Sequence, residues 1–253
     1  MDNAPARALQ RQLGSSTKGR MRALVAFDLD GVLYSSEPFL GDAYREAIAT
    51  VNERRPGSFP RVPTTEEVLQ HVGWPVSVIL ERLFPQIEAT AVALLYDATL
   101  EVICARVARG EGRLFEDVAA TLDALRQKGV LLAVASNGRR RYVETVLATY
   151  GLTERFVPLL TVDDEGAVHS KTDLLRAYRA RHGVPVGQLV MVGDRASDVE
   201  AAGAAGYLFV GCDYGHGHRD EIVGAGPIIA TFADLPTALA ELPFTLPNAE
   251  GDR

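Results

Sequence analysis

The amino-acid sequence predicts an α/β protein with a doubly wound parallel sheet and a smaller all-helical domain inserted after the first strand. Short apolar runs alternate with stretches of helical spacing from residue 114 onward. Strands that alternate with helices in this way form parallel sheets with right-handed crossovers. Residues 38–109 instead have helical spacing interrupted by proline and glycine, without the alternation typical of strands.

The length and composition fit this two-part organisation. The chain has 253 residues, 47% of them hydrophobic, which is enough for one large core or two unequal ones. A net charge of -7 argues against nucleic acid or an anionic membrane as the main partner. No apolar run approaches the roughly 20 residues that a membrane span needs. Two cysteines, Cys104 and Cys212, suit a reducing compartment, so we expect a cytoplasmic protein.

The first strand is expected within ALVAFDLDGVLYS, residues 23–35, and it sets the pattern for the others. Such apolar runs indicate buried parallel strands, because helices cover both of their faces. Four further strands are expected at 130–136, 188–194, 207–211 and 227–231. A shorter apolar stretch at 156–162 is interpreted as a further strand, between those at 130–136 and 188–194.

These elements divide the chain into segments. We expect a core of residues 21–36 and 113–242, with a helical insertion at 37–112 whose return carries Gly110 and Gly112 as a hinge. Residues 1–20 lack the apolar segment of a secretory signal and are expected to form a disordered leader. Whether that leader targets an organelle is left open. Residues 243–253 are expected to form a polar tail.

Polar residues follow three of the predicted strands. Parallel strands end at one edge of a sheet, where α/β proteins bind their ligands, so these residues should lie close together. Taken singly, each cluster is explained by a turn, a helix cap or an acidic first turn. Their joint occurrence, with a lysine at the start of an intervening helix, instead favours a site formed by Asp28, Asp30, Ser136, Asn137, Gly138, Lys171, Asp194 and Asp198.

This set of side chains suits phosphoryl transfer. Mg²⁺ prefers carboxylate oxygen and commonly bridges a protein to a substrate phosphate, and Asp28 and Asp194 could ligate it. The Ser136 hydroxyl, the Lys171 ammonium and backbone amides at a helix start offer donors to phosphate oxygens. An aspartate can also act as a nucleophile and form an aspartyl-phosphate.

The motifs FDLDGVL, ASNG and VGDRASD, together with Lys171 between the last two, resemble the haloacid dehalogenase superfamily, which is mostly phosphatases and phosphomutases. The resemblance covers roughly residues 22–239. A helical cap inserted after the first motif is similar to that of the phosphoglycolate phosphatase and β-phosphoglucomutase group. The resemblance implies the α/β core already predicted and identifies residues 37–112 as the cap.

The resemblance also implies a role for each polar residue. Asp28 would attack phosphorus, and Asp30 would act as general acid and base, which argues against dehalogenation. Ser136, Asn137 and Gly138 would bind the phosphoryl group, while Lys171 would offset negative charge. Mg²⁺ would be held by Asp28, the backbone carbonyl of Asp30 and Asp194, with Asp198 behind them or linked through water.

We therefore expect a Mg²⁺-dependent phosphatase that hydrolyses a small phosphorylated metabolite through an aspartyl-phosphate and is phosphoglycolate phosphatase-like. A phosphomutase of the β-phosphoglucomutase type is the alternative enzyme, and a non-catalytic phosphate- or metal-binding regulator is a further alternative. The cap is expected to exclude water and to supply specificity arginines such as Arg45, Arg54 or Arg55. The sequence assigns no oligomeric state.

The loop GCDYGHGH, residues 211–218, also suggests a zinc site through its cysteine, aspartate and histidines. Its spacing matches none of the usual zinc-ligand pairs. A glycine-rich loop close to the catalytic edge of the sheet, as in the resembling family, is the simpler interpretation.

Overall fold

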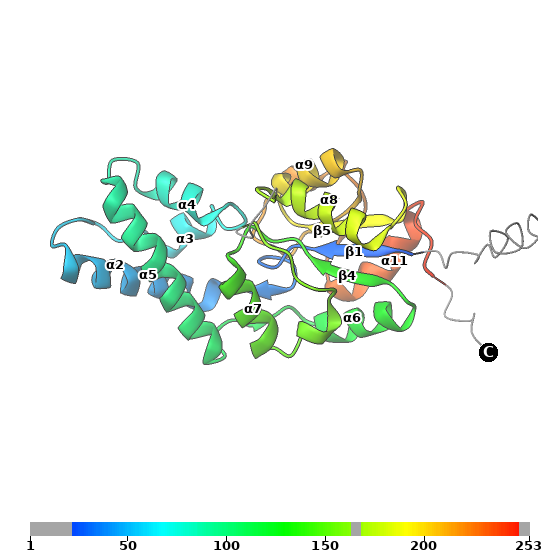
Figure 1. Cartoon of the computed structure of the whole chain (residues 1–253), viewed down its shortest axis with the longest axis horizontal. Coiled ribbons are helices and arrows are strands. Elements are labelled where there is room, and N and C mark those ends of the chain that lie inside the picture. Colours follow the sequence, from blue (N-terminus) through cyan, green and yellow to red (C-terminus); the bar gives the residue numbers. More distant parts are fainter. Residues whose placement is uncertain (1–21, 163–167, 248–253) are drawn as a thin grey trace, which may run out of the picture.

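The computed structural model describes residues 22–162 and 168–247. The predicted leader and the last six residues of the predicted tail therefore lie outside the described residues. Figure 1 shows two parts joined end to end: a sheet covered by helices, and a group of helices without a sheet. None of the described helices is both long and apolar enough to cross a bilayer.

The first part is built on a parallel sheet with the strand order β4-β1-β5-β6-β7. The chain places β4 on one side of β1 and then β5 on the other, so β1 lies at the point where the strand order reverses. This is the predicted α/β fold class. The strands are β1 (Leu24–Phe27), β4 (Leu131–Val134), β5 (Leu189–Gly193), β6 (Leu208–Cys212) and β7 (Ile228–Ile229).

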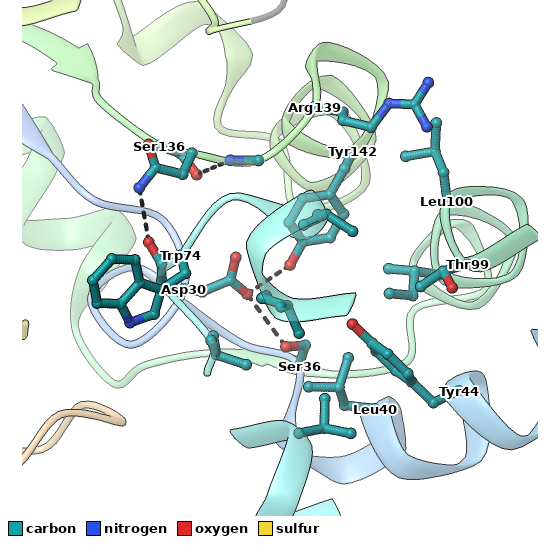
Figure 2. Close-up of a pocket in the computed structure, with 18 of the residues that line it drawn as sticks. Asp30, Ser36, Leu40, Tyr44, Trp74, Thr99, Leu100, Ser136, Arg139 and Tyr142 are labelled. Carbon is teal, nitrogen blue, oxygen red and sulfur yellow. Dashed lines mark hydrogen bonds between the residues drawn. The ribbon is translucent and has the colours of Figure 1, made fainter. Parts of the chain in front are cut away.

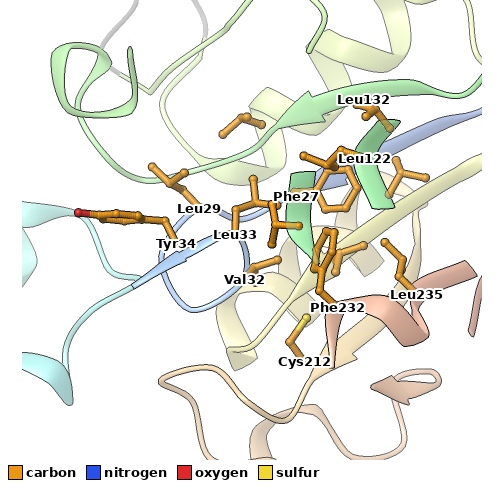
Figure 3. Packing of buried hydrophobic residues seen from close by; sticks show 14 of the residues in the cluster. Phe27, Leu29, Val32, Leu33, Tyr34, Leu122, Leu132, Cys212, Phe232 and Leu235 are labelled. Atoms are coloured by element: carbon orange, nitrogen blue, oxygen red, sulfur yellow. The ribbon is translucent and has the colours of Figure 1, made fainter. Parts of the chain in front are cut away.

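Helices cover both faces of this sheet (Figure 1). In β1 the side chains of Val25 and Phe27 join the core on one face, whereas Leu24 and Ala26 join the core on the other. Figure 3 shows the first of these cores, where Phe27 packs against Phe232 with ring centroids 5.8 Å apart. The first face carries α6 (Val118–Gln127), α7 (Arg140–Thr149) and α11 (Leu235–Glu241), and the second carries α8 (Lys171–His182) and α9 (Ala196–Ala205).

The second part, which we call the cap, has a hydrophobic core of its own that includes Leu40, Ile48, Leu80 and Leu95. Its two long helices lie side by side in Figure 1. A capping box at Thr64 begins one short helix, because its side chain accepts from the Glu67 amide. The cap helices are α2 (Glu37–Arg54), α3 (Thr65–Leu69), α4 (Val76–Leu83) and α5 (Ala89–Ala108).

The chain enters and leaves the cap through two short antiparallel strands, β2 (Tyr34–Ser35) and β3 (Arg113–Leu114). The Tyr34 hydroxyl donates to the Glu111 carbonyl at 2.7 Å. Gly112 has φ +87°, and a Cβ there would lie 2.0 Å from the Tyr34 hydroxyl oxygen. Only glycine fits this position, while the predicted hinge motion at Gly110 and Gly112 stays a prediction.

The predicted strand at 156–162 is wrong. A short 3₁₀-helix at Thr153–Arg155 precedes an irregular stretch there. The Val157 amide donates to the Leu132 carbonyl of β4 at 2.8 Å, but the next residue is Pro158, which has no N–H to continue a ladder. The stretch therefore runs beside the sheet without joining it. The remaining short elements are α10 (Arg219–Ile222) and a 3₁₀-helix at Phe232–Asp234.

Candidate active site

Asp28 follows β1 directly and is buried, with 2% of its surface exposed. Its Oδ1 accepts from the Leu29 amide at 2.8 Å, and its Oδ2 lies 2.9 Å from Lys171 Nζ in an ion pair. Burial raises the pKa of Asp28 well above its usual range, and the charge of Lys171 opposes this shift. The carboxylate form of Asp28 therefore depends on positive charge placed beside it.

Lys171 reaches the site from the first residue of α8. The helix starts there because the Ser170 side chain accepts from the Asp173 amide at 3.2 Å. The buried ammonium group lies between Asp28 and Asp198 and forms an ion pair with each. Burial opposes the charged form, but Asp198 and Asp28 outweigh it and raise the pKa of Lys171 above its usual value. Lys171 is thus held as a cation.

Asp194 follows β5 directly, and Asp198 lies in the first turn of α9. Both oxygens of Asp198 are engaged: Oδ1 pairs with Lys171, and Oδ2 accepts from the Asp194 and Arg195 amides at 3.1 Å each. Asp194 Oδ2 accepts from the His216 amide at 2.7 Å, whereas its Oδ1 is buried without a hydrogen-bond partner among the described residues. Burial and, secondly, Asp198 raise the pKa of Asp194 to about 7.

These carboxylates fit a divalent cation. Asp28, Asp194 and Asp198 each offer one oxygen, and these oxygens lie within 4.8 Å of one another. All three carboxyl groups are buried, and Lys171 forms ion pairs with Asp28 and Asp198 but not with Asp194, so a cation would compensate the remaining negative charge. An all-oxygen donor set suits Mg²⁺. Asp28 Oδ2 and Asp194 Oδ1 are buried without a hydrogen-bond partner among the described residues, whereas both oxygens of Asp198 accept hydrogen bonds. Asp28 and Asp194 are therefore the residues available to hold such an ion directly.

The glycine-rich loop 211–218 supports Asp194 through its backbone. The amides of His216 and Gly217 donate to Asp194 Oδ2 at 2.7 and 3.0 Å. A Cβ at Gly217 would lie 1.8 Å from the Asp194 carbonyl oxygen, and one at Gly215 would lie 2.4 Å from Asp194 Cβ. The close approach of this loop therefore requires glycine. Within the described ranges, the acidic cluster with metal-binding geometry includes no residue of this loop.

Asp30 lies two residues beyond the nucleophile candidate and faces the cavity below the cap (Figure 2). The Tyr142 hydroxyl donates to Asp30 Oδ1 at 2.6 Å, and the Ser36 hydroxyl donates to the same oxygen at 3.3 Å. Burial raises the pKa of Asp30 to about 6, although both hydrogen bonds oppose the shift. Sequence reasoning missed Tyr142 as a functional residue, because its spacing in a helix is that of a core residue.

The loop after β4 places one polar side chain, Ser136, beside the site and another, Asn137, against the cap. Ser136 is buried, and its hydroxyl accepts from the Gly138 amide at 3.0 Å. Asn137, a predicted substrate-binding residue, lines the cavity, and its side-chain nitrogen donates to the Gly73 carbonyl of the cap at 2.8 Å. On the other side of β1, Arg195 donates to the Leu69 carbonyl of the cap at 3.0 Å. The sequence carried no signal for these two contacts.

A cavity separates the polar residues of the core from the cap (Figure 2). We call the polar set Asp28, Asp30, Lys171, Asp194 and Asp198 the floor. We call the cap side chains that line this cavity the roof; they are Leu40, Tyr44, Val68, Val72, Trp74, Val76, Ile79, Tyr96, Thr99, Leu100 and Ile103.

The arginines expected to set specificity do not line the cavity. Arg45 pairs with Asp42 on the exposed surface of α2, and Arg55 pairs with Glu88 at 3.0 Å. Arg54 is exposed at the end of α2. Sequence spacing placed these residues in the cap correctly but could not tell which face of α2 they occupy.

Comparison with known proteins identifies the class. The family model for haloacid dehalogenase-like hydrolases matches residues 23–206, which include β1, the cap and the loops that carry the floor. The chain therefore belongs to this family, and it is an enzyme of the hydrolase class.

Its curated relatives share one name. The phosphoglycolate phosphatase of Haemophilus influenzae (strain 86-028NP) is 31% identical over 85% of this chain and 97% of its own length. That of Pasteurella multocida (strain Pm70) is 29% identical with the same coverage. These relatives are phosphoric monoester hydrolases by name.

Solved structures agree on the fold. A predicted phosphoglycolate phosphatase from Haemophilus somnus 129PT matches with a TM-score of 0.74 and 24% identity, over 85% of this chain and 97% of that protein. A predicted phosphatase from Clostridium acetobutylicum matches with a TM-score of 0.72 and 21% identity, over 88% of this chain and all of that protein.

Proposed function

We propose that this protein is a Mg²⁺-dependent phosphatase that hydrolyses a small phosphorylated metabolite through an aspartyl-phosphate on Asp28. One observation carries the proposal: a buried carboxylate paired with a lysine at 2.9 Å lies at the bottom of a covered cavity, with a second, separately held carboxyl group beside it. The names of the curated relatives support the same reaction class.

Asp28 and Asp194 would hold Mg²⁺, which when bound draws electrons from the phosphoryl oxygens and neutralises their charge. In the first step Asp28 attacks phosphorus and the bond from phosphorus to the leaving oxygen breaks. Protonated Asp30 donates its proton to that oxygen, so the product alcohol leaves neutral. Lys171 stabilises the charge on Asp28 and the phosphoryl group, and the Ser136 hydroxyl offers a further contact to a phosphoryl oxygen.

In the second step Asp30, now a carboxylate, accepts a proton from water. The resulting hydroxide attacks phosphorus, the bond between phosphorus and Asp28 breaks, and inorganic phosphate leaves. Tyr142 and Ser36 hold one oxygen of Asp30 in both steps, so that the other oxygen carries the proton. Both steps thus use one proton, carried by one residue.

The test is phosphate release from a panel of phosphomonoesters, with Mg²⁺ and with excess chelator, for the wild type and Asp28→Asn. Asp42→Asn, which changes an exposed aspartate of α2, is the matched control. We expect metal-dependent release that falls by about 10⁴-fold or more in Asp28→Asn and is unchanged in the control. If Asp28→Asn has the melting temperature of the wild type, the loss of activity is not caused by unfolding.

Other outcomes would replace the proposal. Release that persists in Asp28→Asn would rule out the aspartyl-phosphate. Transfer of phosphate between two hydroxyls of a sugar phosphate, without net release, would indicate a phosphomutase.

Both cysteines are free and buried, and we place the activity in the reducing cytoplasm, where such thiols stay reduced.

A further inference from the structure

The roof is apolar where it faces the floor. Leu40, Val72 and Ile79 are buried in the cap and line the cavity, and Leu100 and Ile103 extend this surface along α5. No lysine or arginine of the cap lines the cavity within the described residues. A leaving group that occupies this space therefore meets hydrocarbon.

Outside the floor, the core contributes one cationic side chain to the cavity lining, Arg139, and this side chain already has partners in the cap. The Arg139 guanidinium lies 4.3 Å from the ring centroid of Tyr96, a geometry typical of cation–π contacts. The same group forms an ion pair with Asp97 at 3.2 Å. Arg139 therefore closes the edge of the cavity and offers no unpaired charge to a substrate carboxylate.

Two hydroxyl groups interrupt the apolar roof. The Thr99 hydroxyl is buried and has no hydrogen-bond partner among the described residues, although its side chain lines the cavity. The Tyr44 hydroxyl points into the same cavity (Figure 2), and burial alone raises the pKa of Tyr44. An unpaired buried hydroxyl is unfavourable, so the Thr99 hydroxyl is suited to an uncharged oxygen on a bound molecule. The Tyr44 hydroxyl, which points into the cavity, offers a second donor to such an oxygen.

We propose that the substrate of this site is the phosphate monoester of an uncharged, mainly hydrocarbon alcohol that carries one further oxygen for Thr99 or Tyr44. The inference rests on the proposed function, because the floor must bind the phosphoryl group for the roof to meet the leaving group. A leaving group with a carboxylate, such as that of phosphoglycolate, would bury an unpaired charge against the roof and is disfavoured.

The experiment compares matched pairs of substrates that differ in charge and little in shape. Hydroxyacetone phosphate is paired with phosphoglycolate, and 4-acetylbenzyl phosphate with 4-carboxybenzyl phosphate, so that aliphatic and aromatic alcohols are both represented. Acetyl phosphate, which makes little use of the roof, reports on the floor alone. We expect kcat/KM for the uncharged member of the preferred pair to exceed that of the charged member by about 100-fold.

Two variants test the roof directly. Leu100→Arg places a cation at a half-buried position of α5 and should move the ratio of the first pair toward phosphoglycolate by about tenfold or more. Leu94→Arg adds the same charge at an exposed position of the same helix and should leave the ratio unchanged. Thr99→Val should lower kcat/KM about fivefold for 4-hydroxybutyl phosphate but not for butyl phosphate.

The outcomes separate this inference from the proposed function. If acetyl phosphate is hydrolysed in an Asp28-dependent way and phosphoglycolate equals or exceeds its uncharged partner, the inference is wrong and the phosphatase stands. If no compound is hydrolysed, including acetyl phosphate, both fail. A preference for the uncharged members that Leu100→Arg reduces and Leu94→Arg does not would establish the inference.

Discussion

The floor and the roof meet at one cavity, which Asp28 and Asp30 of the floor line, but the two regions are built from different kinds of side chain. Each carboxyl group of the floor has a partner: Lys171 for Asp28, a tyrosine for Asp30, and two backbone amides each for Asp194 and Asp198. The roof is mostly hydrocarbon, and the Thr99 hydroxyl has no hydrogen-bond partner in the part of the chain that the structure describes. Chemistry needs fixed charges at fixed positions, whereas the choice of a leaving group needs only shape and polarity.

The largest effect is expected from a substitution that removes the positive charge of the floor. Lys171→Met would leave Asp28 and Asp198 buried without their cation, so the free energy of unfolding should fall by about 3–5 kcal/mol. Turnover should fall about 100- to 1000-fold. Denaturant unfolding and phosphate release measure the two effects.

The loss of stability should be larger above neutral pH than in mild acid. The carboxyl groups beside residue 171 are ionised at high pH and repel one another once the lysine is gone, whereas protonation relieves that repulsion. Lys128→Met, at an exposed position, is the control. Equal stability of Lys171→Met and wild type at all pH values would contradict the assigned ion pairs.

The next largest effect is expected at Asp194, and it tests whether this residue binds the metal ion. Asp194→Asn removes one buried charge from the floor, so the variant without metal should be at least as stable as the wild type. Saturating Mg²⁺ should stabilise the wild type by about 2–3 kcal/mol at roughly 100 times its Kd, and the variant much less. Thermal unfolding with and without Mg²⁺ measures the difference. Equal stabilisation of both proteins would place the ion elsewhere.

A smaller effect is expected where the floor meets the helix α7. Tyr142→Phe removes the shorter hydrogen bond to Asp30, so kcat/KM should fall about tenfold. That bond lowers the pKa of Asp30, so its loss should raise the pKa above the present value of about 6. The general acid must be protonated, and kcat/KM therefore declines as pH rises through this pKa. The declining limb should move to higher pH.

The pH profile distinguishes a positioning residue from a structural one. Tyr150→Phe removes a hydroxyl that lies at the end of the same helix and contacts the carbonyls of Gly110, Glu111 and Gly112. This control should keep the wild-type pH profile. A Tyr142→Phe profile that also stays in place would show that the hydroxyl does not act through Asp30.

The smallest effect concerns the contacts between the two regions. Asn137→Ala removes one hydrogen bond from the core to a cap carbonyl, worth about 0.5–1.5 kcal/mol. Arg195→Ala removes a second such bond and, with it, the ion pair of Arg195 with Glu221 at 3.3 Å. We expect KM to rise a few-fold in each, with little change in the melting temperature of Asn137→Ala and a lower one for Arg195→Ala. The double variant should show whether the two bonds act together. A KM that is unchanged in the double variant would mean that these bonds do not hold the closed cap.

Much of the floor could be predicted because its residues stand out in the sequence. Asp28, Asp30 and Asp194 follow apolar strands, and the parallel sheet brings those strand ends together. The role of Asp198 was less visible, since its position fits an acidic first turn but its contacts depend on where Lys171 points. Sequence order located the loops, and packing determined which atoms meet.

The roof could not be predicted in this way. Leu100 lines the cavity, Leu80 and Leu95 fill the cap core, and Ile79 does both. The spacing of apolar residues does not separate these cases. The prediction of a strand at 156–162 failed for a related reason. The run is apolar like a strand, but Pro158 has no N–H with which to continue a ladder. Apolar residues reveal burial but not what they are buried against.

The contacts between core and cap have one more consequence, which concerns how freely the cap can change. Asn137 and Arg195 bond to the carbonyl oxygens of Gly73 and Leu69, and a carbonyl is present whatever side chain the residue carries. Side chains in the turn between these acceptors can therefore be exchanged without removing either attachment point, provided that the backbone keeps its path. A new specificity can thus be built into the roof while the closure that protects the reaction is retained.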